Sequence, residues 1–246
     1  MPARISIIIP ALNEEHTIAE VVRNLASALA AGSFVGEILV VDNGSTDNTV
    51  TRAAEAGATV IHTPHRGYGR ACASGVQAAD PASSVFVFLD GDGSDVTSDL
   101  PAIANPVLDD RYDFVIGSRT RGQREPGSML PSQLFAGWLA GVLIHLRYGV
   151  RYTDMGPFRA ISRAALDRLQ MSEMTYGWNL EMQMKAARDG LRILEVPVSY
   201  RLRQGGVSKV AGSIQGSVKA ATRIMKVFLA ISFGAETKWR ARSSHD

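Results

Sequence analysis

The chain has little of what would mark a secreted or cysteine-ligated protein. It has one cysteine among 246 residues, Cys72, which excludes an intrachain disulfide and a Cys/His metal site. Basic and acidic residues nearly balance, for a formal net charge of +2, so charge gives no argument for nucleic acid as a partner. The first four residues run straight into a strand pattern, so we expect no secretory signal and a cytoplasmic location.

Long apolar runs are also missing. The longest uncharged apolar stretch, residues 134–144, is too short to cross a bilayer core of ~30 Å at about 1.5 Å per residue. We therefore expect no membrane-spanning helix. The 246 residues, 46% of them hydrophobic, suffice for one large α/β domain with a sizeable core.

Short apolar strands alternate with helical patterns in the first half of the chain. Strands are predicted at residues 5–9, 37–41, 58–62, 85–89 and 114–117, with helices between them. This alternation predicts an α/β fold with a doubly wound, mostly parallel sheet. Beyond a polar loop at 119–131, we predict helices at 132–147, 178–188 and 214–233, a short strand after a turn at 154–159, and strands at 191–196 and 198–202.

Asp90 and Asp92 follow directly on the apolar run at 85–89, with one glycine between them. That run is typical of a strand buried on both faces of a parallel sheet, and open α/β sheets bind ligands at the carboxyl ends of such strands. Magnesium in nucleotide sites takes one or two carboxylates and completes its shell with water and phosphate oxygens. The pair thus favours a metal and diphosphate site, with an Asp-Gly turn as the alternative.

Four strand ends carry polar, glycine-rich loops, at residues 11–15, 42–47, 66–70 and 90–95. In a parallel sheet these loops emerge at one edge, so they predict a single site. Its candidate residues are Asn13, Glu14, Asp42, Gly67, Asp90 and Asp92. The first strand is not followed by Gly-x-Gly-x-x-Gly, which argues against a dinucleotide-binding enzyme.

These motifs, in this order, resemble the family 2 glycosyltransferases, which have the GT-A (Rossmann-like) fold. The first half carries PALNEE at 10–15, VDNGSTD at 41–47, GYG at 67–69 and DGD at 90–92. The second half is similar to the dolichyl- or polyprenyl-phosphate sugar synthases, through GSR at 117–119, DMGPFR at 154–159, GWNLE at 177–181, EVP at 195–197 and RQGGVSK at 203–209. The resemblance divides the chain into a glycosyltransferase domain at 1–213, with a nucleotide-sugar half (1–118) and an acceptor half (119–213), and an amphipathic helix with a basic tail at 214–246.

The resemblance implies an inverting hexosyltransferase that moves one sugar from a UDP-glucose or GDP-mannose type of donor to a polyprenyl or dolichyl phosphate. UDP-glucose is the preferred expectation. Asp90 and Asp92 would hold Mg²⁺ or Mn²⁺, and Asp42 with Asn13 or Glu14 would hold the base and ribose. The other donor-side residues it implies are Pro10, Ala11, Gly67, Gly91, Arg203, Ser208 and Lys209.

On the acceptor side, the resemblance implies that Arg119 faces the acceptor phosphate. A phosphate is already ionised near neutral pH, whereas a hydroxyl acceptor needs a general base, for which Asp154 and Glu181 are the candidates. Structural alternatives are a solvated loop charge for Arg119, and a helix-surface acid or the holder of a loop for Glu181. Arg159 has a structural alternative too, as a partner of Asp154.

Two helices raise the question of a membrane. The predicted helix at 132–147 is apolar on more than one stripe, and the C-terminal helix is basic and amphipathic. Such helices lie in a membrane interface, or they pack on each other or on a second subunit of a homo-oligomer. The chain departs from its relatives at Asn43, where many have Asp, and before the apolar helix, where a basic residue and a Gly-Asn pair are missing.

Three alternatives remain open from the sequence. The first is transfer by the same fold to a soluble hydroxyl acceptor, which the departures above allow. The second is a nucleotidyltransferase, although the loop after the first strand lacks the glycines and basic residues usual there. The third is a non-catalytic nucleotide-sugar binding module, against which the intact Asp90 and Asp92 pair speaks.

Overall fold

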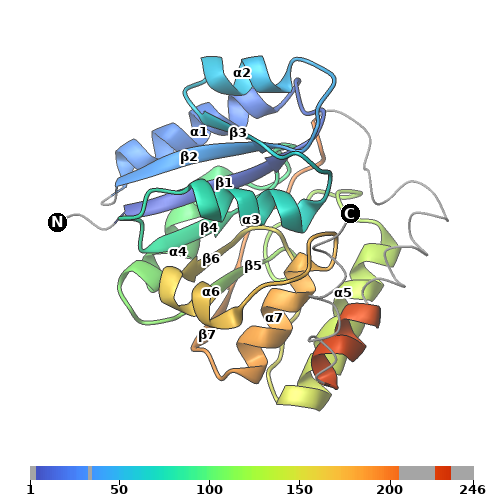
Figure 1. Cartoon of the computed structure of the whole chain (residues 1–246). Coiled ribbons are helices and arrows are strands. Elements are labelled where there is room, and N and C mark those ends of the chain that lie inside the picture. The colour runs from blue at the N-terminus through green and yellow to red at the C-terminus, as the bar shows by residue number, and fades with distance from the viewer. Residues whose placement is uncertain (1–3, 33–34, 205–224, 234–246) are drawn as a thin grey trace.

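The computed structural model describes residues 4–32, 35–204 and 225–233 and has one seven-stranded sheet as its centre (Figure 1). The strand order is β3-β2-β1-β4-β6-β5-β7. The strands are β1 (Arg4–Ala11), β2 (Val35–Asp42), β3 (Thr59–His62), β4 (Val85–Phe88), β5 (Phe114–Ser118), β6 (Arg159–Ser162) and β7 (Ile193–Pro197). Only β6 runs antiparallel to its neighbours, so the predicted mostly parallel sheet is confirmed.

Helices cover both faces of the sheet (Figure 1). They are α1 (Ile18–Ala31), α2 (Thr49–Glu55), α3 (Tyr68–Ala78), the 3₁₀ turn η1 (Thr97–Asp99), α4 (Leu100–Leu108), α5 (Pro131–Tyr148), α6 (Arg163–Leu169) and α7 (Trp178–Arg188). Residues from α1, α2 and α4 pack on one face, and residues from α3, α5, α6 and α7 pack on the other. Ile8 lies in the second cluster and Ile7 and Ile9 in the first, because successive strand residues point to opposite faces.

The sequence prediction is wrong at residues 198–202, which do not form a strand. Tyr200 makes only isolated bridges, to Asp95 and Arg124. The backbone N–H groups of this segment bond to separate loops: Val198 donates to Ser118 O at 3.1 Å and Arg201 donates to Ser94 O at 2.9 Å. We call residues 198–204 the strap, because they tie the loop after β4 to the loop after β5.

Two other differences concern single elements. Pro10 does not end β1, which continues to Ala11; its pairing with β4 stops at Ile8 and Phe88, so Pro10 lies beyond that ladder. The sequence pattern also missed α6, a seven-residue helix whose N-terminus is capped by the Ser162 hydroxyl, which accepts from Ala165 N at 3.2 Å. Residues 225–232 are helical, and the rest of the predicted C-terminal helix lies outside the described residues.

An ion pair inside α7 fixes the loop that precedes it. Glu181 and Lys185, one helical turn apart, are 2% and 1% exposed and lie 2.8 Å apart. The Glu181 carboxylate also accepts from the backbone N–H groups of Ser172 and Glu173 and from the Ser172 hydroxyl. These bonds hold residues 172–175 against the start of α3, where Arg70 N donates to Met174 O at 2.9 Å.

Within the described residues, no helix combines the length and hydropathy needed to span a membrane.

Replacing Lys185 with Met should lower the free energy of unfolding by about 3–5 kcal/mol, because Glu181 would keep a buried charge without its cation. Urea denaturation measures the change. Lys226→Met, on the exposed side of the helical segment at 225–232, is the matched control and should change stability little. Equal stability of the two variants would contradict the structural role of the pair.

Candidate functional site

The carboxyl ends of β1 and β2 lie side by side at one edge of the sheet. Pro10 pairs with Val41 and Ala11 with Asp42, and Asn43 N donates to Ala11 O at 2.8 Å. This pairing brings Pro10, Ala11 and Asp42 together, as the sequence predicts. The residues that follow each strand then form the floor of one site.

The loops after β1 and β2 hold each other through reciprocal bonds. Asn13, with a positive φ of 54°, donates its N–H to Ser45 Oγ at 3.0 Å and accepts from Thr46 N through Oδ1 at 2.8 Å. Glu14 N donates to Thr49 Oγ1 at 2.8 Å. Asn13 and Glu14 therefore lie together at this edge of the sheet, held by the loop that follows β2.

Asp42 and Asn43 shape the next part of the edge. Asp42 Oδ1 accepts from Ser45 N at 2.9 Å, and its Oδ2 lies 3.4 Å from His62 Nδ1. Asn43 Oδ1 accepts from Gly67 N at 2.9 Å. A side chain at Gly67 would collide with the Met174 carbonyl, and its φ of 154° also favours glycine. Asn43 thus holds the Gly67 loop in place.

The loop after β4 carries three carboxylates, of which the sequence analysis had singled out two. Asp90 is half-buried, while Asp92 and Asp95 are buried. Burial, and then the charge of Asp92, raise the pKa of Asp90 to about 7. Burial, and then Asp90 and Asp92, also raise the pKa of Asp95 well above its usual value. The ionised forms of Asp90 and Asp95 are therefore disfavoured, and an added cation beside them would favour those forms.

Hydrogen bonds fix the shape of this acidic loop. Asp95 Oδ2 accepts from Asp90 N at 3.1 Å, and Asp92 Oδ1 accepts from Ser94 N at 2.9 Å. The carbonyl of Gly91 accepts from Thr17 Oγ1 at 2.8 Å, which ties the loop to the start of α1. Asp95 thus holds the backbone of Asp90 in place. Its position in the same loop as Asp90 and Asp92 is the one feature of the sequence that points to this role.

Arg203 lies across the acidic loop, brought there by the strap. Its Nη2 is 2.7 Å from Asp92 Oδ2, and its Nη1 is 3.1 Å from Glu14 Oε1. Burial alone would lower the pKa of Arg203, but the charges of Asp92 and Glu14 outweigh it and raise that pKa. Arg203 therefore joins the donor-side residues, as predicted. Ser208 and Lys209, predicted beside it, lie outside the described residues.

The acidic loop suits a hard divalent cation. Asp90 and Asp92 offer carboxylate oxygens, which Mg²⁺ and Mn²⁺ prefer, and the raised pKa of Asp90 shows that its negative charge is poorly balanced. Among the described residues, no three or more acidic, His or Cys side chains converge to hold a metal ion. The donor set therefore fits an ion whose remaining ligands are water and substrate oxygens.

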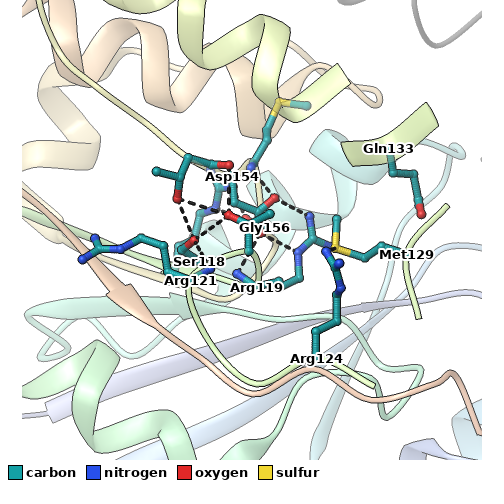
Figure 2. A network of polar contacts seen from close by, with 12 residues as sticks. Ser118, Arg119, Arg121, Arg124, Met129, Gln133, Asp154 and Gly156 are labelled. Atoms are coloured by element: carbon teal, nitrogen blue, oxygen red, sulfur yellow. Dashed lines mark hydrogen bonds and ion pairs between the residues drawn. The ribbon is translucent and has the colours of Figure 1, made fainter. Parts of the chain in front are cut away.

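On the other side of the sheet edge, Arg119 and Asp154 form a two-pronged ion pair (Figure 2). Arg119 Nε lies 2.7 Å from Asp154 Oδ2, and Nη2 lies 2.8 Å from Oδ1. The Arg119 guanidinium also lies 4.9 Å from the centre of the Tyr200 ring in the strap. Burial alone would raise the pKa of Asp154, but Arg119 outweighs it and holds the pKa below the usual value. Asp154 is consequently a weak proton acceptor.

Two more arginines surround this pair (Figure 2). Arg121 Nη1 donates to Glu195 O at 3.0 Å and lies 3.7 Å from the Glu195 carboxylate. Arg124 is exposed, its Nη1 lies 3.8 Å from Met129 Sδ, and it forms no ion pair with any described residue. Arg119 thus pairs with Asp154 and Arg121 with Glu195, whereas Arg124 has no ion pair among the described residues. No recognised motif contains Arg124, so the sequence offers no signal for it.

The structure departs from two expectations about this part of the site, the pairing of Arg159 with Asp154 and the role of Glu181 as a base. Arg159 is fully buried and bonds to the carbonyls of Gly156 and Asn179, so it is not the partner of Asp154. Glu181 lies in the interior with Lys185 and the backbone of residues 172–173. Its contacts match the loop-holding alternative, and they give no support to its catalytic prediction.

Comparison with known proteins shows the family of the chain. The model of the family described as Glycosyl transferase family 2 matches residues 6–170. An uncharacterized glycosyltransferase of Mycobacterium tuberculosis is 36% identical over 225 residues, which cover 91% of this chain and 97% of that protein. An undecaprenyl-phosphate mannosyltransferase of Micrococcus luteus is 31% identical over 230 residues, covering 87% of this chain and 90% of that one.

A solved structure shares the fold. It is glucosyl-3-phosphoglycerate synthase from Mycobacterium tuberculosis, in complex with Mn²⁺, UDP-glucose and phosphoglyceric acid. Its TM-score is 0.73 at 22% identity, and the match covers 94% of this chain and 80% of that one. Together with the motifs at the sheet edge, these likenesses show that the chain is an enzyme with the GT-A fold and belongs to glycosyl transferase family 2.

Proposed function

We propose that the protein transfers one sugar from a nucleotide diphosphate donor to a polyprenyl phosphate, with inversion at the sugar carbon. The observation that carries this proposal is the division of charge at the sheet edge. Asp90, Asp92 and Asp95 gather carboxyl groups beside the loops of β1 and β2, where the pKa of Asp90 and of Asp95 is raised, and Arg124, near Asp154, forms no ion pair with a described residue. A metal-bound diphosphate fits the first region, and an anionic acceptor fits the second.

On the donor side, Asn13, Glu14 and Asp42 would contact the base and ribose, and Asp90 and Asp92 would hold Mg²⁺ or Mn²⁺. The ion, when bound, neutralises the charge that develops on the leaving diphosphate. UDP-glucose is our first choice of donor, supported by the motifs and by the bound UDP-glucose and Mn²⁺ of the glucosyl-3-phosphoglycerate synthase structure.

On the acceptor side, an ionised phosphate oxygen would attack the sugar carbon while the bond to the nucleoside diphosphate breaks. Such an acceptor needs no general base. This agrees with the surroundings of Asp154 and Glu181, whose carboxylates are engaged by Arg119 and by Lys185. We assign Arg119 to the wall of the acceptor site, fixed by Asp154, and Arg124 to the contact with the acceptor anion.

A lipid acceptor is supported by the apolar surface of α5. Phe135 and Trp138 are 61% and 58% exposed, and their ring centres lie 5.8 Å apart. Phe233, which directly follows the helical segment at 225–232, is also exposed, and Ser232 O in that segment accepts from Arg147 of α5 at 3.2 Å. Aromatic side chains of this kind anchor peripheral proteins in the membrane interface. We therefore place the enzyme at the cytoplasmic face of the membrane, as a peripheral protein.

A soluble anionic acceptor is the second candidate, favoured by the fold neighbour that binds phosphoglyceric acid. Family membership speaks against the nucleotidyltransferase and the non-catalytic module.

The two acceptors can be told apart directly. With Mn²⁺ and a panel of UDP-glucose, UDP-N-acetylglucosamine and GDP-mannose, we expect one donor to give a lipid-linked sugar on a short polyprenyl phosphate. Product formation is read by mass spectrometry. Transfer to 3-phosphoglycerate and not to the lipid would replace the lipid with a soluble acceptor, and turnover of no donor would overturn the proposed function.

Asp92→Asn should lower the transfer rate by at least ~100-fold, because the variant loses a metal-ligating charge while keeping the volume of the side chain. Circular dichroism and thermal melting check that the fold is kept. Asp109→Asn, at an exposed ion pair with Arg111, is the control and should keep full activity. Normal turnover by the Asp92 variant would remove this residue from the metal site.

Arg124→Ala should raise the KM for the acceptor by ~10- to ~100-fold and leave the KM for the donor unchanged, since a hydrogen bond to a charged group contributes about 1.5–3 kcal/mol. Steady-state kinetics with each substrate varied in turn separates the two constants. Arg111→Ala, also an exposed arginine, is the control. A change confined to the donor KM would refute the acceptor assignment.

A further inference from the structure

Arg203 occupies one of the carboxylates that the proposed metal needs. Its Nη2 lies 2.7 Å from Asp92 Oδ2. The other oxygen of that carboxylate, Oδ1, accepts from Ser94 N at 2.9 Å and helps to shape the loop. The oxygen of Asp92 best placed to take a ligand is thus already paired with a cation of this chain.

Two cations that share one carboxylate compete for it. A guanidinium carries a full positive charge at every pH in which the protein is folded, so it cannot give way by losing a proton. The Arg203 side chain can free the Asp92 carboxylate only by moving away from it. Since like charges repel strongly where water is partly excluded, a metal ion at Asp92 and Arg203 in its present place disfavour each other.

Arg203 has an alternative ion-pair partner in Glu14. The Nη1 of Arg203 is 3.1 Å from Glu14 Oε1, so the side chain has a second carboxylate beside it when it leaves Asp92. The side chain is 26% exposed, whereas Asp92 and Glu14 are almost fully covered. In the described part of the strap, the backbone is anchored at each of residues 198–202, and Arg203 is held through its side chain.

We propose that Arg203 is an internal counter-ion of the metal site: it pairs with Asp92 in the free enzyme, is displaced when the metal binds, and then contacts the diphosphate of the donor. The first step is the pair seen in the structure, the second rests on the metal site proposed above, and the third rests on the proposed donor. Through this exchange, metal binding delivers a phosphate-binding guanidinium to the donor. The device makes metal and donor binding cooperative through one side chain.

The test is Mn²⁺ affinity in the absence of any donor, measured by electron paramagnetic resonance of free Mn²⁺. Arg203→Ala should bind Mn²⁺ about tenfold more tightly than the wild type, because the competing cation is gone. Arg203→Lys keeps the positive charge but loses the two-pronged guanidinium, so its Mn²⁺ affinity should lie between those of the wild type and Arg203→Ala. Arg201→Ala removes an exposed arginine from the same strap and should match the wild type.

The second arm adds UDP. Saturating UDP should tighten Mn²⁺ binding clearly more in the wild type than in Arg203→Ala, because only the wild type can bring the guanidinium to the phosphates. If alanine destabilises the strap, Arg203→Gln replaces it in both arms, with thermal melting as the check. An Mn²⁺ affinity without UDP that is unchanged or weaker in the Arg203 variants, or absent in all proteins, would overturn the inference.

The two proposals fail separately. The Mn²⁺ titration requires no sugar transfer, so tighter binding by Arg203→Ala supports the counter-ion even in a protein that turns over no donor. Sugar transfer by the wild type, together with an unaltered Mn²⁺ affinity of the variant, would overturn the counter-ion alone.

Discussion

The repulsion among three carboxylates in the loop after β4 is the constraint on which the rest of the site depends. Asp90, Asp92 and Asp95 lie within six residues, at the end of a strand that is buried on both faces. Burial removes much of the water that would screen them, so the pKa values of Asp90 and Asp95 rise. The surrounding structure can be understood as a partial compensation: backbone N–H groups bond to Asp92 and Asp95, and one arginine comes from the strap.

The fold and the donor side could largely be predicted because their signals are local. Alternating strands and helices fix a mostly parallel sheet, and a parallel sheet brings its polar carboxyl-terminal loops to one edge whatever their detailed shape. Asn13, Asp42 and Asp90 could therefore be assigned to one site without knowledge of any contact. The same rule could not show that Asn43 holds Gly67, because that bond depends on the path of two loops.

The acceptor side and the strap could not be predicted because their contacts join distant parts of the chain. Arg203 and Glu14 are 189 positions apart, and Val198, Tyr200 and Leu202 alternate as in a strand although their neighbours are loops. Which arginine pairs with Asp154 depends on β6: Arg159, at its first residue, turns into the core over the Phe114 ring, whereas Arg119 follows the end of β5 and reaches Asp154.

The position of β6 has a consequence for how the molecule is built. This strand comes from the second half of the chain, yet it lies between β4 and β5, which come from the first half. A fragment ending near residue 118 would leave both strands with bare hydrogen-bonding edges in the middle of the sheet. The two halves of the chain therefore share one sheet, and we expect them to fold as one cooperative unit.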